Sequence, residues 1–273
     1  MTGIAAPNGT LLEARATTRS VARTFALACR LLPRAIRDDV YLLYLVFRTL
    51  DELVDRGSPE EAGRRVEAVS AWAERRSGAQ TREVQVLDLL AANHHLPRAA
   101  IADFCAGMRQ DLAHETFATE ADVDRYGYRV AGTVGVVMTA VLGVRDPSRA
   151  LPAAVALGIA MQRTNMLRDI DEDLAAGRVY LARETVERHG SLEPGRRAGL
   201  LREQIAYADR LYELGLEGIG ELRCGRRAIA AAAAMYREIL RQIEREGYGA
   251  SAGRASVGTA RKLAVGGRAT WRG

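Results

Sequence analysis

The sequence predicts an all-α protein. Apolar residues recur at three- and four-residue intervals along most of the chain, runs of alternating β-branched residues are few, and only seven prolines interrupt the 273 residues. A chain of this length can bury a substantial core, as one large domain or two small ones. We find no internal repeat and no linker, so we expect residues 1–273 to form one domain with a loose terminus over residues 1–10.

Local signals set the expected helix boundaries. Pro33 fits the first turn of a helix, Ser58 caps the helix that begins at Pro59, and Thr119 with Asp122 forms a capping-box-like start. Gly57 is expected to end one helix. The predicted helices cover, in order, residues 11–32, 33–55, 58–76, 97–115, 119–135, 146–177, 196–223 and 225–247.

The charge balance limits the kinds of partner. The net charge is +5 and the pI is about 9.4, which can indicate nucleic acid, an anionic membrane or an anionic ligand. The arginines are spread along helices, and aromatic residues make up only 5% of the chain, so stacking platforms for bases are lacking. We therefore expect an anionic ligand and no nucleic acid.

Cysteine usage and hydropathy indicate a cytoplasmic protein. Cys29, Cys105 and Cys224 are widely spaced, so they predict neither a disulfide framework nor a zinc site. The N-terminus lacks a basic segment followed by an apolar core, and residues 130–144 fall short of the roughly 20 residues of a spanning helix. Peripheral contact with a membrane surface and the oligomeric state stay open.

The most informative stretch is residues 162–181. If the helix continues toward Gly177, then Gln162, Asn165, Asp169 and Asp173 lie on or near one helix face. Mg²⁺ prefers carboxylate and amide oxygens, and it usually takes one or two protein carboxylates with water and phosphate oxygens. With Arg168 beside them, these side chains predict a site for a metal and a diphosphate.

A second acidic stretch lies upstream. Asp51 and Asp55 are four residues apart, about 6 Å on a helix, and Arg48 lies one turn earlier. They fall at the C-terminal end of the predicted helix, where the helix dipole disfavours carboxylates unless a cation is near. Either acidic pair alone is typical of a solvated helix face, so the argument depends on both stretches and on their neighbours.

Those neighbours resemble the squalene and phytoene synthase family over most of the chain. The first block is Thr24-Phe25, Arg30 to Pro33, Tyr44 and residues 48–55, and the second is Gly107-Met108 with Asp111-Leu112. Residues 126–135 are similar to the tyrosine and glycine segment of the family, and residues 162–181 to its second aspartate-rich motif. The order and spacing of these blocks make the resemblance specific.

The resemblance implies a fold and a reaction. The fold would be the isoprenoid synthase (class I terpenoid synthase) helical bundle around a central cavity. The reaction would be Mg²⁺-dependent head-to-head condensation of two prenyl diphosphates through a cyclopropylcarbinyl diphosphate. Phytoene synthesis from geranylgeranyl diphosphate is the first expectation, and squalene-type synthesis from farnesyl diphosphate is the second. The alternatives are a class I terpene cyclase that uses one prenyl diphosphate and, outside enzymes, a helical interaction protein with acidic patches.

The resemblance and the residue chemistry together assign candidate roles. Mg²⁺ ligands are Asp51, Asp55, Asn165, Asp169 and Asp173, and the four aspartates also count as catalytic. Diphosphate contacts are Thr24, Arg48, Gln162, Asn165, Arg168 and Arg178, because guanidinium groups form charge-assisted bonds to phosphate oxygens. Tyr44 and Tyr126 are candidates to steer the second stage or relay a proton. Asp111 is expected near the cavity.

Three positions depart from the family pattern. Glu52 replaces a second adjacent Asp, Ala182 replaces the proline that commonly follows Tyr-Leu, and Thr24 replaces Ser. We expect Glu52 to shift metal geometry and Ala182 to loosen the loop that closes over the site. Gly132 and Gly135 predict either close helix packing or room for a prenyl chain. No Gly-rich dinucleotide motif is present, although its absence does not decide whether NADPH is used.

Overall fold

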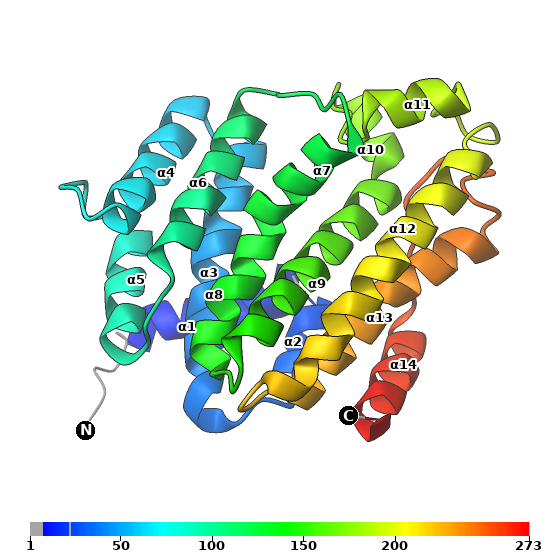
Figure 1. The fold of residues 1–273 in the computed structure, drawn as a ribbon. Helices are drawn as coiled ribbons and strands as arrows, with labels where there is room; N and C mark the ends of the chain where they lie inside the picture. The colour runs from blue at the N-terminus through cyan, green and yellow to red at the C-terminus, as the bar shows by residue number, and fades with distance from the viewer. Residues whose placement is uncertain (1–7, 22, 273) are drawn as a thin grey trace.

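Helices account for the architecture of this protein (Figure 1). The computed structural model describes residues 8–21 and 23–272, and these contain no β-strand, only one isolated bridge between Val144 and Leu222. The all-α expectation is confirmed.

The elements follow one another with short connections. They are α1 (Asn8–Val21), α2 (Arg23–Cys29), α3 (Arg34–Arg56), α4 (Pro59–Ala73), α5 (Arg82–Asn93), α6 (Arg98–Leu112), α7 (Glu120–Gly127), a π-helical turn (Tyr128–Gly132), α8 (Thr133–Leu142), α9 (Pro147–Arg168), α10 (Ile170–Ala175), α11 (Arg183–His189), α12 (Ala198–Glu217), a 3₁₀ turn (Gly218–Glu221), α13 (Arg226–Arg245) and α14 (Thr259–Arg272).

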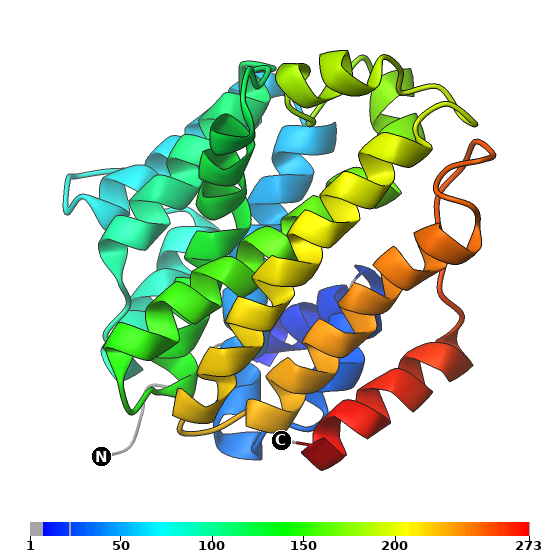
Figure 2. The ribbon, with the colours of Figure 1, turned by 45° about the vertical axis from the view of Figure 1, so that its right-hand side comes forward.

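Helix α9 lies in the middle of the bundle. It packs against α8 on one side and α12 on the other, and it also contacts α13 and both irregular turns (Figures 1 and 2). Helices α4, α5 and α6 pack beside α3, while α14 packs on α13 at the opposite edge. The central position of α9 places its polar residues inside the bundle.

Several predicted boundaries are confirmed. Helix α3 starts directly after Pro33 and ends at Gly57. The Ser58 hydroxyl accepts a hydrogen bond from the backbone N–H of Glu61 at the start of α4. Thr119 and Asp122 form a complete capping box at the start of α7, in which each side chain bonds the backbone N–H of the other residue.

Other boundaries differ from the prediction. Residues 8–10 belong to α1, so the loose terminus predicted over residues 1–10 is wrong there, and residues 1–7 lie outside the described part. The helix predicted over 11–32 corresponds to α1 and α2, which together end at Cys29, and residue 22 between them lies outside the described part. Helices α5, α11 and α14 were not expected. Helix α11 has only 7 residues, too few to show a period, and α14 is largely exposed.

The predicted helix 146–177 also divides. Helix α9 ends at Arg168, Asp169 has non-helical dihedral angles (φ −104°, ψ 10°), and α10 then begins at Ile170. The change of direction lets Asp171 reach partners on the outer side of α10, while Asp169 and Asp173 stay on the cavity side. Tertiary contacts therefore override local helix propensity here.

Small residues bring α9 very close to the segment that precedes it. A Cβ on Gly158 would lie 2.4 Å from the carbonyl oxygen of Ala131, and a Cβ on Gly135 would lie 2.5 Å from that of Ala154. Gly135 and Gly158 also line the central cavity. For Gly135 the two interpretations are therefore compatible, whereas Gly132 packs near Tyr128 and Val155 and is not part of the cavity lining.

This packing predicts the effect of two glycine substitutions. Gly158→Ala should lower the free energy of unfolding by about 1–3 kcal/mol, because the new methyl group overlaps backbone atoms that cannot move aside. Gly63→Ala is the matched control, since it also lies within a helix but has no atom within 4 Å of the added Cβ. It should raise stability by about 0.5–1 kcal/mol. Urea denaturation measures both, and equal effects would contradict the packing argument.

Candidate active site

A cavity of about 580 Å³ opens between α3, α6, α8, α9 and α13. One end is polar, with side chains from α3, α9, α10 and the loop that follows α10. The rest is apolar, with Phe47, Val134, Met138, Leu157 and Ile229 among its walls. Such a shape suits an amphipathic ligand with an anionic head and a hydrocarbon chain.

Helix α3 provides the first acidic group. The Arg48 Nη1 atom lies 2.5 Å from Asp51 Oδ2, and Arg48 Nε donates to Glu52 at 3.0 Å. Asp51 and Asp55 line the cavity. Glu52 is not part of the lining, so this departure from the family pattern keeps Arg48 paired and does not add a carboxylate to the cavity wall.

Helices α9 and α10 provide the second acidic group. Arg168 forms a bidentate pair with Asp169, with Nε–Oδ1 and Nη2–Oδ2 distances of 2.7 and 2.5 Å. Asn165 Nδ2 donates to Gln162 Oε1 at 3.3 Å. The four side chains named here line the cavity together with Asp173.

Polar contacts join the first acidic group to Asp111 through the loop after α10. Arg178 Nη1 lies 3.0 Å from Asp55 Oδ1 and donates to the Tyr180 hydroxyl at 3.1 Å. Tyr126 and Tyr180 both donate to Asp111 Oδ1, at 2.8 and 3.3 Å, and their rings stack with centroids 5.6 Å apart. The loop after α10 thereby connects α3 to α6 and α7.

The structure brings the predicted residues together. Every predicted site residue with a described side chain lines the one cavity: Tyr44, Arg48, Asp51, Asp55, Tyr126, Gln162, Asn165, Arg168, Asp169, Asp173 and Arg178. Thr24 belongs to α2, but its side chain lies outside the described part. Asp111 lines the same cavity, as expected. The chemical roles of these residues stay predictions.

Several polar residues of the cavity lining, among them Tyr180, Glu172 and Tyr236, did not enter the predicted site. Tyr180 follows Arg178 by two positions in an extended segment, so the spacing could have placed both side chains on one side. Glu172 sits inside the acidic motif itself. Tyr236 in α13 is distant in sequence, and no local pattern marks it. For Arg254 the sequence left two alternatives, the basic side of the cavity or a solvated C-terminal end, and the structure places it in the cavity lining.

The protein environment keeps several carboxyl groups from ionising easily. Burial, then the nearby Asp55, raises the pKa of Asp51 to about 6. Burial, then Asp169, raises the pKa of Asp173 to about 6, and Asp55 raises it further from across the cavity. Burial likewise raises the pKa of Asp111 to about 7, with contributions from Asp51 and Asp55. The site therefore concentrates negative charge that a cation would stabilise.

The donor set fits Mg²⁺. The oxygens available are carboxylates of Asp51, Asp55, Asp169 and Asp173 and the amide oxygen of Asn165, which is buried without a hydrogen-bond partner. Among the described residues, no three His, Cys, Asp or Glu side chains already converge as a closed metal site. This arrangement agrees with an ion that takes few protein ligands and completes its shell with water and phosphate.

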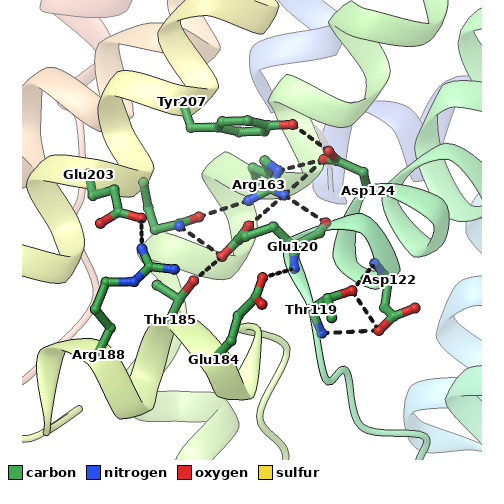
Figure 3. A network of polar contacts seen from close by, with 11 residues as sticks. Thr119, Glu120, Asp122, Asp124, Arg163, Glu184, Thr185, Arg188, Glu203 and Tyr207 are labelled. Atoms are coloured by element: carbon green, nitrogen blue, oxygen red, sulfur yellow. Dashed lines mark hydrogen bonds and ion pairs between the residues drawn. The ribbon is translucent and has the colours of Figure 1, made fainter.

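A buried network on the other side of α9 holds the loops of the site (Figure 3). Arg163, only 2% exposed, donates to Asp124 Oδ1 at 2.9 Å and to Gln204 Oε1 at 2.8 Å, and pairs with Glu120. Glu120 also accepts from Thr185 at the start of α11. The loop carrying Arg178 and Tyr180 therefore ends at a fixed anchor.

Ala182 lies within this anchored stretch. Its φ of −61° is close to the value that a proline imposes, and its side chain is fully buried beside Phe117 and Tyr126. The next residue, Arg183, donates its backbone N–H to Phe117 O at 2.9 Å. The backbone here thus keeps a proline-like conformation.

Across the described chain, no helix has the length and apolar character needed to span a bilayer.

Comparisons with known proteins agree with this geometry. The sequence profile of the squalene/phytoene synthase family matches residues 18–261. A phytoene synthase of Arthrospira platensis is 33% identical over 91% of this chain and 88% of its own, and one of Thermus thermophilus is 37% identical over 84% and 82%.

Solved structures give the same answer. A dehydrosqualene synthase crystallised with a ligand superposes with a TM-score of 0.87, at 26% identity over 97% of this chain and 96% of that protein. A squalene synthase of Alicyclobacillus acidocaldarius gives a TM-score of 0.76, at 25% identity over 88% and 95%. Sequence and structure together show that this chain is a prenyltransferase that belongs to the squalene/phytoene synthase family.

Proposed function

We propose that this enzyme joins two prenyl diphosphates head to head in a Mg²⁺-dependent reaction. The observation that carries the proposal is the single cavity in which carboxylates of α3 face those of α9 and α10 at one end, above an apolar chamber. Bound Mg²⁺ would supply charge stabilisation for the leaving diphosphate, and Asp51, Asp55, Asn165, Asp169 and Asp173 would hold it. Arg48, Arg168 and Arg178 would bind the diphosphate oxygens.

The chemistry begins when the allylic C–O bond of one substrate breaks. Its electron pair leaves with the diphosphate, whose developing charge the arginines stabilise, and an allylic carbocation remains. The double bond of the second prenyl diphosphate attacks this cation, and loss of a proton closes a cyclopropane ring. The apolar walls exclude water from the cation, which keeps hydrolysis from competing.

The tyrosine cluster is suited to the second stage. When the second diphosphate leaves the cyclopropylcarbinyl intermediate, a new carbocation forms and rearranges, and transfer of a proton to an oxygen of the released diphosphate would give the neutral hydrocarbon. Tyr126 and Tyr180 line the cavity, and both hydroxyls donate to Asp111. Phenol rings stabilise a nearby cation through their faces, and Asp111 fixes the ring orientation. Tyr44 stacks on Phe25 at 5.1 Å and offers a second aromatic face.

The substrate we favour is geranylgeranyl diphosphate, which would make the enzyme a phytoene synthase. The support is the identity of the sequence relatives, which are named phytoene synthases at 33–37% identity over most of the chain. Squalene-type coupling of farnesyl diphosphate is the second candidate, because the dehydrosqualene synthase structure superposes over almost the whole chain.

The product decides between these activities. Purified enzyme with Mg²⁺ should convert geranylgeranyl diphosphate into a hydrocarbon of twice its carbon number, and omission of Mg²⁺ should abolish the reaction. Mass spectrometry of extracts from parallel reactions with geranyl, farnesyl and geranylgeranyl diphosphates measures this. Doubling of farnesyl diphosphate alone would support the squalene-type alternative. A product with the substrate's own carbon number would indicate a cyclase and contradict the proposal.

Asp51 should be essential to the first ionisation. Asp51→Asn removes one charge from the proposed metal site and should lower kcat by about 10²–10³-fold at saturating Mg²⁺. Asp39→Asn is the control, because Asp39 lies on the same helix but bonds His94 outside the cavity. Its kcat should stay within about threefold of wild type, since it lacks contact with the site. Similar losses in the two variants would count against the metal role of Asp51.

Asp111 should make the metal-free protein sensitive to pH. Its pKa is about 7 in the folded protein against an ordinary value of 3.8, so the folded state holds the proton more tightly than the unfolded state. Stability should therefore fall as pH rises from about 4 to about 7 and then level off, by up to about 1.4 kcal/mol per pH unit. Asp111→Asn removes this dependence.

The difference in unfolding free energy between wild type and Asp111→Asn, measured by urea denaturation without Mg²⁺ from pH 5 to 9, isolates this one group. The wild-type value should decline relative to the variant up to about pH 7 and run parallel above it. A constant difference over the whole range would show that Asp111 ionises normally.

A further inference from the structure

The outer side of α10 carries an ion pair between Asp171 and Arg197, here called the clasp, that is separate from the cavity. Asp171 is absent from the cavity lining, unlike Asp169, Glu172 and Asp173. Its carboxylate accepts from both terminal nitrogens of Arg197, at 2.5 and 2.7 Å, and from the backbone N–H of Gly253 at 2.7 Å. The Arg197 side chain is only 3% exposed. This pair therefore joins α10 to the segment between α13 and α14.

That segment, residues 246–258, depends on such anchors for its position. Gly247, Gly249 and Gly253 have φ values of +78°, +74° and +125°, and Tyr248 has φ +56°. A backbone with several glycines in these conformations is costly to order, because glycine loses the most conformational freedom on folding. Ala255 and Val257 at its C-terminal end pack in the core, whereas a hollow of about 360 Å³ lies between α10 and residues 249–255.

Arg197 of the clasp packs closely against this segment. A Cβ on Gly249 would lie 2.4 Å from Arg197 Nε, so the arginine occupies the space of a side chain at that position. The Gly249 carbonyl accepts from the Gly195 N–H at 2.8 Å, and the Arg202 guanidinium lies 4.4 Å from the Tyr248 ring centroid. Helix α12 and the loop before it thus hold the segment from one side, and Asp171 holds it from the other.

Arg254 directly follows the clasped residue and turns toward the cavity. Its Nε lies 3.0 Å from Asp169 Oδ1, and its Nη1 lies 3.3 Å from Glu172 Oε2. The side chain lines the polar end of the cavity. A guanidinium at this place adds positive charge where a diphosphate would enter.

We propose that Asp171, held by Arg197, is a positioning residue that fixes Arg254 for diphosphate binding. The inference rests on the proposed function, because it requires an anionic ligand at the acidic end of the cavity. Helix α10 then acts through both of its sides: its inner side bears the proposed metal ligands, and its outer side sets the place of a cation from the C-terminal segment.

A double-mutant cycle tests this coupling. The measurement is isothermal titration of inorganic diphosphate, with Mg²⁺ present, into wild type, Asp171→Asn, Arg254→Ala and the double variant. Asp171→Asn should raise the diphosphate Kd by about fivefold or more, as residues in one network do. If Asp171 acts through Arg254, the double variant should bind like Arg254→Ala alone. Independent, multiplying effects would overturn the proposal.

A second variant, Arg197→Gln, removes the other partner of the clasp. Arg197 lies outside the acidic motif that carries the proposed metal ligands. This variant should weaken diphosphate binding as Asp171→Asn does, and this effect too should vanish in the Arg254→Ala background. Wild-type Kd in Arg197→Gln would overturn the proposal, even if Asp171→Asn failed to fold.

Asp209→Asn is the matched control. Asp209 also accepts from two arginines, Arg237 at 2.6 Å and Arg241 at 2.5 Å, but it does not line the cavity. Its Kd should equal that of wild type, whereas a matching rise would show that general loss of stability explains the effect. Absence of diphosphate binding in wild type would contradict the proposed function itself, whereas normal wild-type binding with an unaffected Asp171→Asn would overturn this inference alone.

Discussion

The buried guanidinium of Arg163 is the interaction on which the site depends. A buried charge needs partners of opposite charge: Asp124 and Glu120 in α7 supply them to Arg163, which is 2% exposed, and the Gln204 amide oxygen in α12 accepts a further hydrogen bond. Removing one partner would leave an uncompensated charge, so these helices are fixed relative to α9. Because Gln162 and Asn165 lie on the cavity side of the same helix, the network also fixes the direction in which they face.

At the polar end of the cavity, arginines and carboxylates lie side by side. Most of the carboxylates there are paired with an arginine: Asp51 with Arg48, Asp169 with Arg168 and Arg254, and Asp55 with Arg178. Burial first, and then neighbouring acids, raise the pKa values of Asp51, Asp111 and Asp173. The protein thus holds both the groups that attract a cation and the groups that attract the anion it accompanies.

The sequence predicted well those features of the structure that depend on residues close together in the chain. The pairs Asp51–Asp55 and Asp169–Asp173, and the caps at Ser58 and Thr119, depend on neighbours within one turn, and the structure places them as expected. The break at Asp169, the π-helical turn and the cavity-side positions of Tyr236 and Arg254 depend on contacts between distant segments. Without knowledge of which helices are neighbours, no spacing rule could have found them.

The link between Asp55 and Arg178 spans 123 residues of chain, and the link between Glu172 and Arg254 spans another 82. Individual helices form from local contacts, whereas a group assembled from such separated segments must wait for long loops to close. Most of the bundle can therefore order before its charged end is complete. Arg254 is synthesised after every other described residue that lines the cavity, so the polar end becomes complete only after the helices that form the cavity walls have been made.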